Sequence, residues 1–293
     1  MRVSPTERMV PVREKVQLLV LTDNVASVSG LVPEHGLSMW IAVDGKRVLF
    51  DTGQGTALPV NAAMLGIDLG TAAAIVLSHG HYDHTGGLGC VFGVGGKPRI
   101  FMHPDAAGMR FGCLQTPPHK AIGMPPDIAA ALSARTADII HTTRPTQVTG
   151  HVWVTGPVPR RTSFEDTGGP LFVDEQCCTK DPITDDQAIW METGAGIVVL
   201  LGCAHSGVVN TLDYISELAR VRQFHAVIGG MHLLNASRER IEATAEALMR
   251  YHVRLVAPCH CTGDAVVPLL AERFPAGYVR AGAGSRFAWP GCD

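Results

Sequence analysis

The residues best suited to chemistry in this chain lie in one short stretch that holds four metal-binding side chains within six positions. The stretch follows residues 73–77, an apolar and partly β-branched run that predicts a buried strand. Side chains two apart on an extended backbone point the same way, so His79 and His81 can bind one ion together. Asp83 and His84 come after the chain has begun to turn, and they point to a second position. The stretch therefore predicts half of a dinuclear metal site.

Two more histidines follow apolar strands much later in the chain. His205 comes soon after the run 198–201, and His260 comes soon after 254–257. Because strand ends of a layered α/β sheet converge on a ligand crevice, both side chains can reach the same place as His79. The alternative for each is a structural histidine whose hydrogen bonds are satisfied in the core.

The pattern His-x-His-x-Asp-His after a strand resembles the metallo-β-lactamase superfamily. The resemblance implies an α/β fold, the αββα sandwich in which two mixed sheets are flanked by helices. It also implies one or two divalent metal ions bridged by water or hydroxide. Nitrogen and oxygen ligands suit zinc, manganese and iron, and we expect zinc, with the other two as alternatives. The implied ligands are His79, His81 and His205 for one ion and Asp83, His84 and His260 for the other.

Further segments are similar to one branch of the superfamily, named for 7,8-dihydropterin-6-yl-methyl-4-(β-D-ribofuranosyl)aminobenzene 5′-phosphate synthase. That branch implies an enzyme of methanopterin-type cofactor biosynthesis, a transferase that condenses a dihydropterin pyrophosphate with an aminobenzene ribosyl phosphate and releases pyrophosphate. The alternative is a metal-dependent hydrolase of a phosphoester, lactone or thioester. A binding or sensing protein and an iron redox enzyme are further alternatives. The similar segments are 34–38, 49–53, 77–88, 202–210, 229–233 and 258–263.

The chain departs from the common superfamily pattern at one position. Many members place an aspartate that bridges both metals after the strand corresponding to 198–201, where this chain has Gly202 and Cys203. Cys203 is either a soft metal ligand or a small buried residue, and we favour the buried interpretation because free cysteine commonly acts as a small hydrophobe. Loss of the bridge would weaken the second metal site.

Some residues near the ligands invite functional roles. By the resemblance, Asp51 would orient the metal loop through hydrogen bonds. Asn24 ends the first strand and either faces the site or caps a turn. His232 follows two glycines that let backbone approach a ligand closely, so it is a candidate proton donor or substrate contact. We name Asp83 and His232 as the catalytic candidates.

Other polar residues carry weaker signals. Arg160, Arg161 and Lys180 could meet a phosphate, although solvated surface charge is the favoured interpretation. Seven further histidines lack ligand spacing and are expected to be structural or on the surface. They are His35, His103, His119, His141, His151, His225 and His252.

Hydrophobic periodicity predicts a strand-rich, layered chain in which an Asp44-Gly45 turn marks a hairpin. Ser237 is the expected N-cap of one helix. Two regions, 104–150 and 157–186, resist assignment and are expected to be insertions, either functional lids or plain surface. The expected strands are 16–22, 37–43, 47–50, 73–77, 98–103, 187–193, 196–202, 226–229 and 254–257, and the expected helices are 57–65, 209–221 and 237–251.

Length and composition limit the class of protein. A chain of 293 residues that is 46% hydrophobic can build one large core, so we expect a single domain over 1–293. A net charge of −3 with 17% charged residues gives no nucleic-acid or anionic-membrane footprint, so the expected partner is a small, phosphorylated substrate. Residues 1–15 lack the apolar core of a signal peptide, which predicts a cytoplasmic protein with reduced thiols. A homodimer remains an open alternative.

Overall fold

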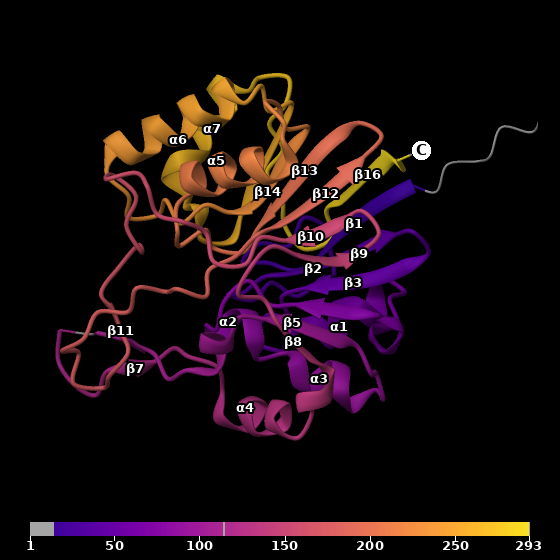
Figure 1. The fold of residues 1–293 in the computed structure, drawn as a ribbon, viewed down its shortest axis with the longest axis vertical. Coiled ribbons are helices and arrows are strands. Elements are labelled where there is room, and N and C mark those ends of the chain that lie inside the picture. The colour runs from indigo at the N-terminus through magenta and orange to yellow at the C-terminus, as the bar shows by residue number, and fades with distance from the viewer. Residues whose placement is uncertain (1–14, 114, 293) are drawn as a thin grey trace, which may run out of the picture.

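The computed structural model describes residues 15–113 and 115–292. Two sheets pack face to face, and helices cover the outer face of each, which is the expected αββα sandwich (Figure 1). Residues 1–14, whose composition predicts no signal peptide, lie outside the described part. Among the described residues, no helix is long and apolar enough to cross a membrane.

The first sheet follows the strand order β16-β1-β2-β3-β4-β5-β8 in the described chain. Strands β2 and β3 form the expected hairpin, in which Val43 pairs with Lys46 across Asp44 and Gly45. Both turn residues have positive φ, as a tight hairpin turn requires. The strands are β1 (Lys15–Thr22), β2 (Ser38–Val43), β3 (Lys46–Phe50), β4 (Ala74–Val76), β5 (Arg99–Met102), β8 (Ile139–His141) and β16 (Arg286–Pro290).

The second sheet follows the order β15-β14-β13-β12-β10-β9. Its β13, β14 and β15 run parallel, so their carboxyl ends meet at one edge of the sheet. The strands are β9 (Thr146–Thr149), β10 (Val152–Val154), β12 (Ile189–Thr193), β13 (Gly196–Leu201), β14 (Ala226–Gly230) and β15 (Leu255–Cys259).

The helices lie on the outer faces. Leu58, Val91 and Ile128 pack against the first sheet, whereas Leu212 and Leu248 pack against the second. The expected N-cap is confirmed, because the Ser237 hydroxyl accepts a hydrogen bond from the backbone N–H of Arg240. The helices are α1 (Ala57–Met64), α2 (Tyr82–Thr85), α3 (Leu88–Gly93), α4 (Pro126–Ser133), α5 (Val208–Ala219), α6 (Arg238–Arg250) and α7 (Val267–Arg273).

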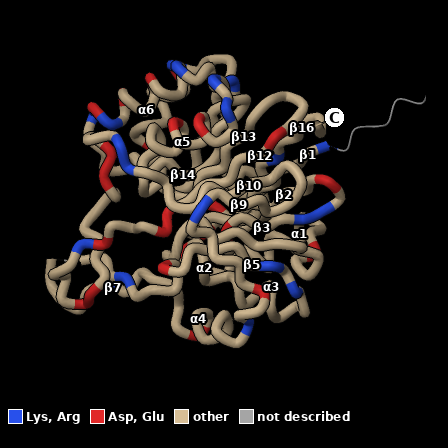
Figure 2. Tube along the Cα trace, in the orientation of Figure 1, with Lys and Arg blue, Asp and Glu red and all other residues tan. Residues whose placement is uncertain are grey.

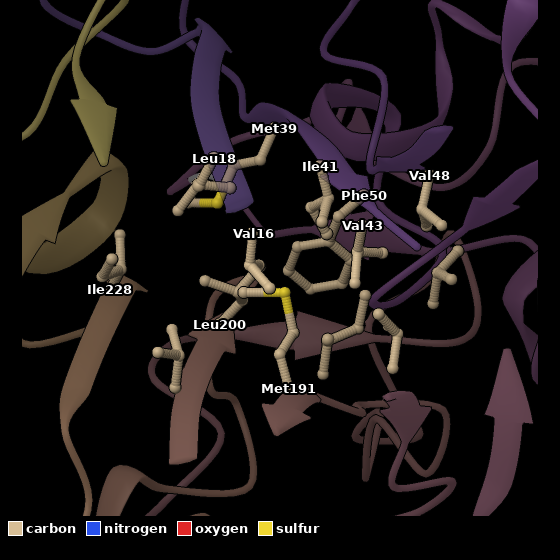
Figure 3. Packing of buried hydrophobic residues seen from close by; sticks show 14 of the residues in the cluster. Val16, Leu18, Met39, Ile41, Val43, Val48, Phe50, Met191, Leu200 and Ile228 are labelled. Carbon is tan, nitrogen blue, oxygen red and sulfur yellow. The ribbon is translucent and has the colours of Figure 1, made fainter. Parts of the chain in front are cut away.

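The central core lies between the two sheets (Figure 3). Val16, Leu18 and Phe50 meet Met191 and Leu200 there, and all five are buried. Alternate residues of the same strands, such as Leu19, face the helices instead. Because each central strand is covered on both faces, its sequence is a nearly continuous apolar run.

Much of the region 104–150 belongs to the layers, since it contributes α4, β8 and β9. The rest of it forms a small third sheet together with the region 157–186. This outer sheet, ordered β11-β6-β7, consists of β6 (Phe111–Gly112), β7 (Lys120–Ala121) and β11 (Leu171–Phe172), and it projects from the body (Figure 1).

A disulfide between Cys113 and Cys177 joins the two regions beside the outer sheet. The expectation that all thiols are reduced is therefore wrong for this pair. The sequence did not show it, because the two cysteines are 64 residues apart and only tertiary contacts bring them together.

Candidate metal centre

The six side chains singled out as ligands come from loops at the carboxyl ends of three strands. His79 and His81 follow β4, and Asp83 and His84 lie in α2 directly after them. His205 follows β13, and His260 follows β15 in a short 3₁₀ turn. All six side chains are buried, and the structure brings them together at one edge of the sandwich.

His79, His81 and His205 form a three-histidine cluster whose ligand atoms all lie within 4.8 Å of one another. His79 Nε2 is 2.9 Å from His81 Nδ1. His205 Nδ1 lies 2.7 Å from the Thr167 carbonyl oxygen, so it donates a hydrogen bond and leaves the Nε2 lone pair free to bind a metal. The Nε2 atoms of His81 and His205 are buried without a hydrogen-bond partner among the described residues. Such orphaned nitrogens fit a metal ion in this position.

Asp83, His84 and His260 form a second cluster beside the first. The Nε2 atoms of His84 and His260 are 3.2 Å apart, and Asp83 Oδ2 lies 3.7 Å from the first and 3.5 Å from the second. His260 Nδ1 is held 3.0 Å from the side-chain oxygen of Asn24. Asn24 therefore faces the site and orients a ligand, which was one of its two predicted roles.

Asp51 holds His84, a member of the second cluster, in place through its carboxylate. One of its carboxylate oxygens lies 2.7 Å from His84 Nδ1 and accepts the Ser78 hydroxyl at 2.7 Å, while the other accepts the Ser78 backbone N–H. These contacts match the orienting role that the resemblance implies. A carboxylate behind a histidine fixes its tautomer and raises its basicity as a ligand.

Burial sets the protonation of the histidines. It lowers the pKa of His79, His81, His205 and His260 well below the usual range, and neighbouring positive charge lowers each further. Burial also acts to lower the pKa of His84, but the Asp51 and Asp83 carboxylates outweigh it and raise the value to about 9. Four neutral imidazoles thus present lone pairs, which is the state that binds a divalent ion.

Cys203 lies inside the site. It is buried as expected, yet its Sγ lies 3.2 Å from His84 Nε2, beside a ligand atom. Burial raises the pKa of its thiol well above the usual range. Cys203 is therefore buried, as one interpretation expected, and it also contacts a ligand atom of the second cluster, as the other requires.

His232 lies at the wall of the site, where its ring centroid is 4.4 Å from that of His205. Its Nε2 is 3.0 Å from the Gly168 carbonyl oxygen. Arg160 is exposed, as the favoured interpretation expected, and its guanidinium also donates a hydrogen bond to the His205 carbonyl oxygen. Arg161 does form an exposed ion pair, with Glu217.

His35 was missed as a site residue. Its Nε2 lies 3.3 Å from Asp83 Oδ2, and its side chain is 56% exposed, at the mouth of the site. It has no ligand spacing, because it comes from a loop 44 residues before the motif. The available signal was its position in the segment 34–38 that resembles the synthase branch.

Two adjoining cavities open onto the clusters. A cavity of about 220 Å³ is lined by His81, Asp83 and His205 together with Tyr82 and Lys120. A larger one of about 620 Å³ is lined by Asn24, Pro258 and Arg280, among others. Both are lined by His35, His232, His260 and Cys261, so a substrate that spans them passes over the metal centre.

Comparison with known proteins agrees with this geometry. The family model described as the metallo-β-lactamase superfamily matches residues 31–165. An uncharacterized protein of Methanocaldococcus jannaschii is 30% identical over 86% of this chain and 93% of its own length. The chain belongs to the metallo-β-lactamase superfamily. It is a metal-dependent enzyme of that fold.

Other members of the metallo-β-lactamase superfamily resemble it over most of their length. The 7,8-dihydropterin-6-methyl-4-(β-D-ribofuranosyl)-aminobenzene-5′-phosphate synthase of M. jannaschii is 27% identical over 92% of this chain and 96% of its own. The crystal structure of Tm1679, a metal-dependent hydrolase of the superfamily, has a TM-score of 0.74 at 27% identity and covers 93% of this chain and 98% of its own. Zn²⁺-bound PqqB from Methylobacterium extorquens shares the fold at 13% identity, with a TM-score of 0.55 and coverage of 92% and 99%.

Proposed function

We propose that the two clusters bind a pair of divalent ions, with zinc as the expected metal at both. We also propose that the enzyme acts on a small phosphorylated molecule. The convergence of the six predicted ligands, with the orphaned Nε2 atoms of His81 and His205, carries this proposal. His79, His81 and His205 would hold one ion, and Asp83, His84 and His260 would hold the other. When bound, such ions polarise phosphoryl oxygens, activate water and stabilise a leaving pyrophosphate.

The residues around the ions supply proton transfer and position. Burial acts to lower the pKa of His232, but contact with the Cys261 thiol outweighs it and the pKa is raised. A protonated His232 at the cavity wall can donate a proton to a leaving group. His35, beside Asp83, lines the same cavities and can contact the substrate at the mouth.

For the reaction, we propose condensation of a dihydropterin pyrophosphate with an aminobenzene ribosyl phosphate, which releases pyrophosphate. The 27% identity to the synthase over nearly the whole chain supports it. Hydrolysis of a phosphoester, lactone or thioester is the second candidate, and the equal identity to a metal-dependent hydrolase supports that one. Both reactions would use the same ligands.

The two reactions are separated by their dependence on the amine. Zinc-loaded enzyme is mixed with the dihydropterin pyrophosphate, with and without the aminobenzene ribosyl phosphate, and released pyrophosphate is measured. Release that requires both compounds supports condensation. Release without the amine supports hydrolysis, and no release at full zinc loading contradicts the condensation proposal.

A further inference from the structure

One lysine side chain lines the smaller cavity. Lys120, from β7 of the outer sheet, lines the 220 Å³ cavity together with His81, Asp83 and His205. Among the described residues that line it, Lys120 is the only lysine or arginine. The outer sheet therefore brings a positive charge to the entrance of the metal centre.

The ammonium group of Lys120 contacts a residue of the ligand loop. Lys120 Nζ donates a hydrogen bond to the Tyr82 hydroxyl at 2.7 Å and lies 4.4 Å from the centre of the Tyr82 ring. Tyr82 stands between His81 and Asp83, so it belongs to the ligand loop itself. Its backbone N–H donates to the Ile122 carbonyl oxygen at 3.0 Å, which ties β7 to that loop. A cation held in this way is oriented before substrate arrives, which reduces the entropy lost on binding.

Buried ion pairs hold the base of the outer sheet. Arg110 contacts Asp181 at 2.9 Å and Asp185 at 2.6 Å, and these side chains are at most 4% exposed. Asp185 also accepts the backbone N–H of Gly80, between the two ligand histidines, and Arg110 accepts the backbone N–H of Ile122 through its carbonyl oxygen. The ligand loop and the segment that carries β7 thus share one buried network, so the fold holds the backbone of Lys120 beside the ligand loop.

We propose that Lys120 is an anion-recognition residue that binds a phosphoryl group of the substrate at the mouth of the metal centre. This inference rests on the proposed function and names the charge its substrate must carry there. An ammonium group is a compact point charge that suits phosphoryl oxygens. Asp83 faces the same cavity but is taken up by the second cluster, so Lys120 remains for the substrate.

Binding of inorganic pyrophosphate to zinc-loaded protein tests the proposal. We compare wild type with Lys120→Met and Lys120→Arg by calorimetry, and we use Lys180→Met as the matched control. Lys180 lies at the edge of the same outer sheet, where it forms an isolated antiparallel β-bridge with Phe172. It is not among the residues that line the smaller cavity. We expect Lys120→Met to weaken binding about tenfold or more, as loss of one charge-assisted contact does. Lys120→Arg should retain most of the affinity, and Lys180→Met should match wild type.

Further measurements separate the possible failures. Zinc content and thermal unfolding of each variant show whether the centre and the fold are intact. Malonate, a dicarboxylate, serves as a second probe, and a larger effect of Lys120→Met on pyrophosphate than on malonate is the expected result. Equal pyrophosphate affinity for wild type and Lys120→Met at full zinc loading would overturn the inference and leave the proposed function standing. No pyrophosphate binding by zinc-loaded wild type would overturn it as well, whereas failure to bind zinc would overturn the proposed function itself.

Discussion

At the scale of single residues, the proposed centre depends on six ligands, of which His81 and His205 have Nε2 atoms without a hydrogen-bond partner among the described residues. His81→Ala and His205→Ala each remove a ligand of the three-histidine cluster, and His260→Ala removes a ligand of the second cluster, so each variant should lose about one zinc equivalent. His81→Ala should also abolish activity. Metal analysis of the purified variants checks this. Two equivalents of zinc in all three variants would contradict the ligand assignment.

The Cys203 thiol offers a spectroscopic prediction. Because its Sγ lies 3.2 Å from His84 Nε2, cobalt bound at the second cluster should meet sulfur and show sulfur-to-cobalt charge-transfer absorption. Cys203→Ser should remove that absorption and weaken the second site, while cobalt stays at the three-histidine cluster. Identical spectra for wild type and Cys203→Ser would mean that the thiol only fills space.

Asp186 gives a pH prediction for the metal-free protein. This buried carboxylate accepts the Ser206 N–H beside His205, and burial raises its pKa to about 6. The folded protein therefore binds more protons than the unfolded chain between pH 4 and 6, so this group's contribution to stability is lost as pH rises through 6. The unfolding free energy should decrease between pH 4.5 and 6.5, and Asp186→Asn should make this decrease smaller by about 2 kcal/mol. An unchanged slope would show that Asp186 does not titrate in this range.

At the scale of elements, the outer sheet depends on ion pairs and a disulfide between residues that are distant in the sequence. Its strands are two residues long, too short to be stable alone, so the Arg110 ion pairs and the Cys113–Cys177 disulfide must hold it. Reduction with a dithiol should increase protease cleavage within 113–177 and leave zinc content unchanged. Cleavage at the same rate before and after reduction would show that the ion pairs suffice.

The end of β14 can pack closely against its neighbours because it consists of two glycines. Gly229 has a φ of +131°, and a Cβ there would lie 2.1 Å from the Leu201 carbonyl oxygen. A Cβ on Gly230 would lie 2.7 Å from Cys261 Sγ. The two glycines therefore let β14 run close to its neighbours and deliver His232 to the cavity wall, whereas the sequence predicted a close approach of the backbone to a ligand.

At the scale of the whole molecule, the central core and the metal centre lie along the same pair of sheets. We propose that residues 1–293 form one domain, and a single cooperative unfolding transition of metal-free protein is the expected result. Removal of metal with a chelator should lower the unfolding temperature, because ions that bind only the folded state stabilise it. Two separated transitions in the metal-free protein would contradict a single domain.

Charge over the whole molecule fits a small substrate better than a polyanion. Basic and acidic residues are interspersed along the chain as seen in Figure 2. With a net charge of −3, recognition of an anion has to be local, at residues such as Lys120 and the proposed metals. Under the proposed function, selectivity for a phosphorylated molecule would be a property of the centre and its mouth.

The sequence by itself determined the features that depend on neighbouring residues. The spacing of His79, His81, Asp83 and His84 marked the metal loop, and apolar periodicity placed the central strands and the helix capped by Ser237, because side-chain direction and capping are set within a few residues. Only the tertiary structure decided the contacts between distant segments. It brought His35 and Asn24 to the ligands, paired Cys113 with Cys177 and added the terminal strand β16 to β1, because such pairs are set by how the sheets pack and leave no local pattern.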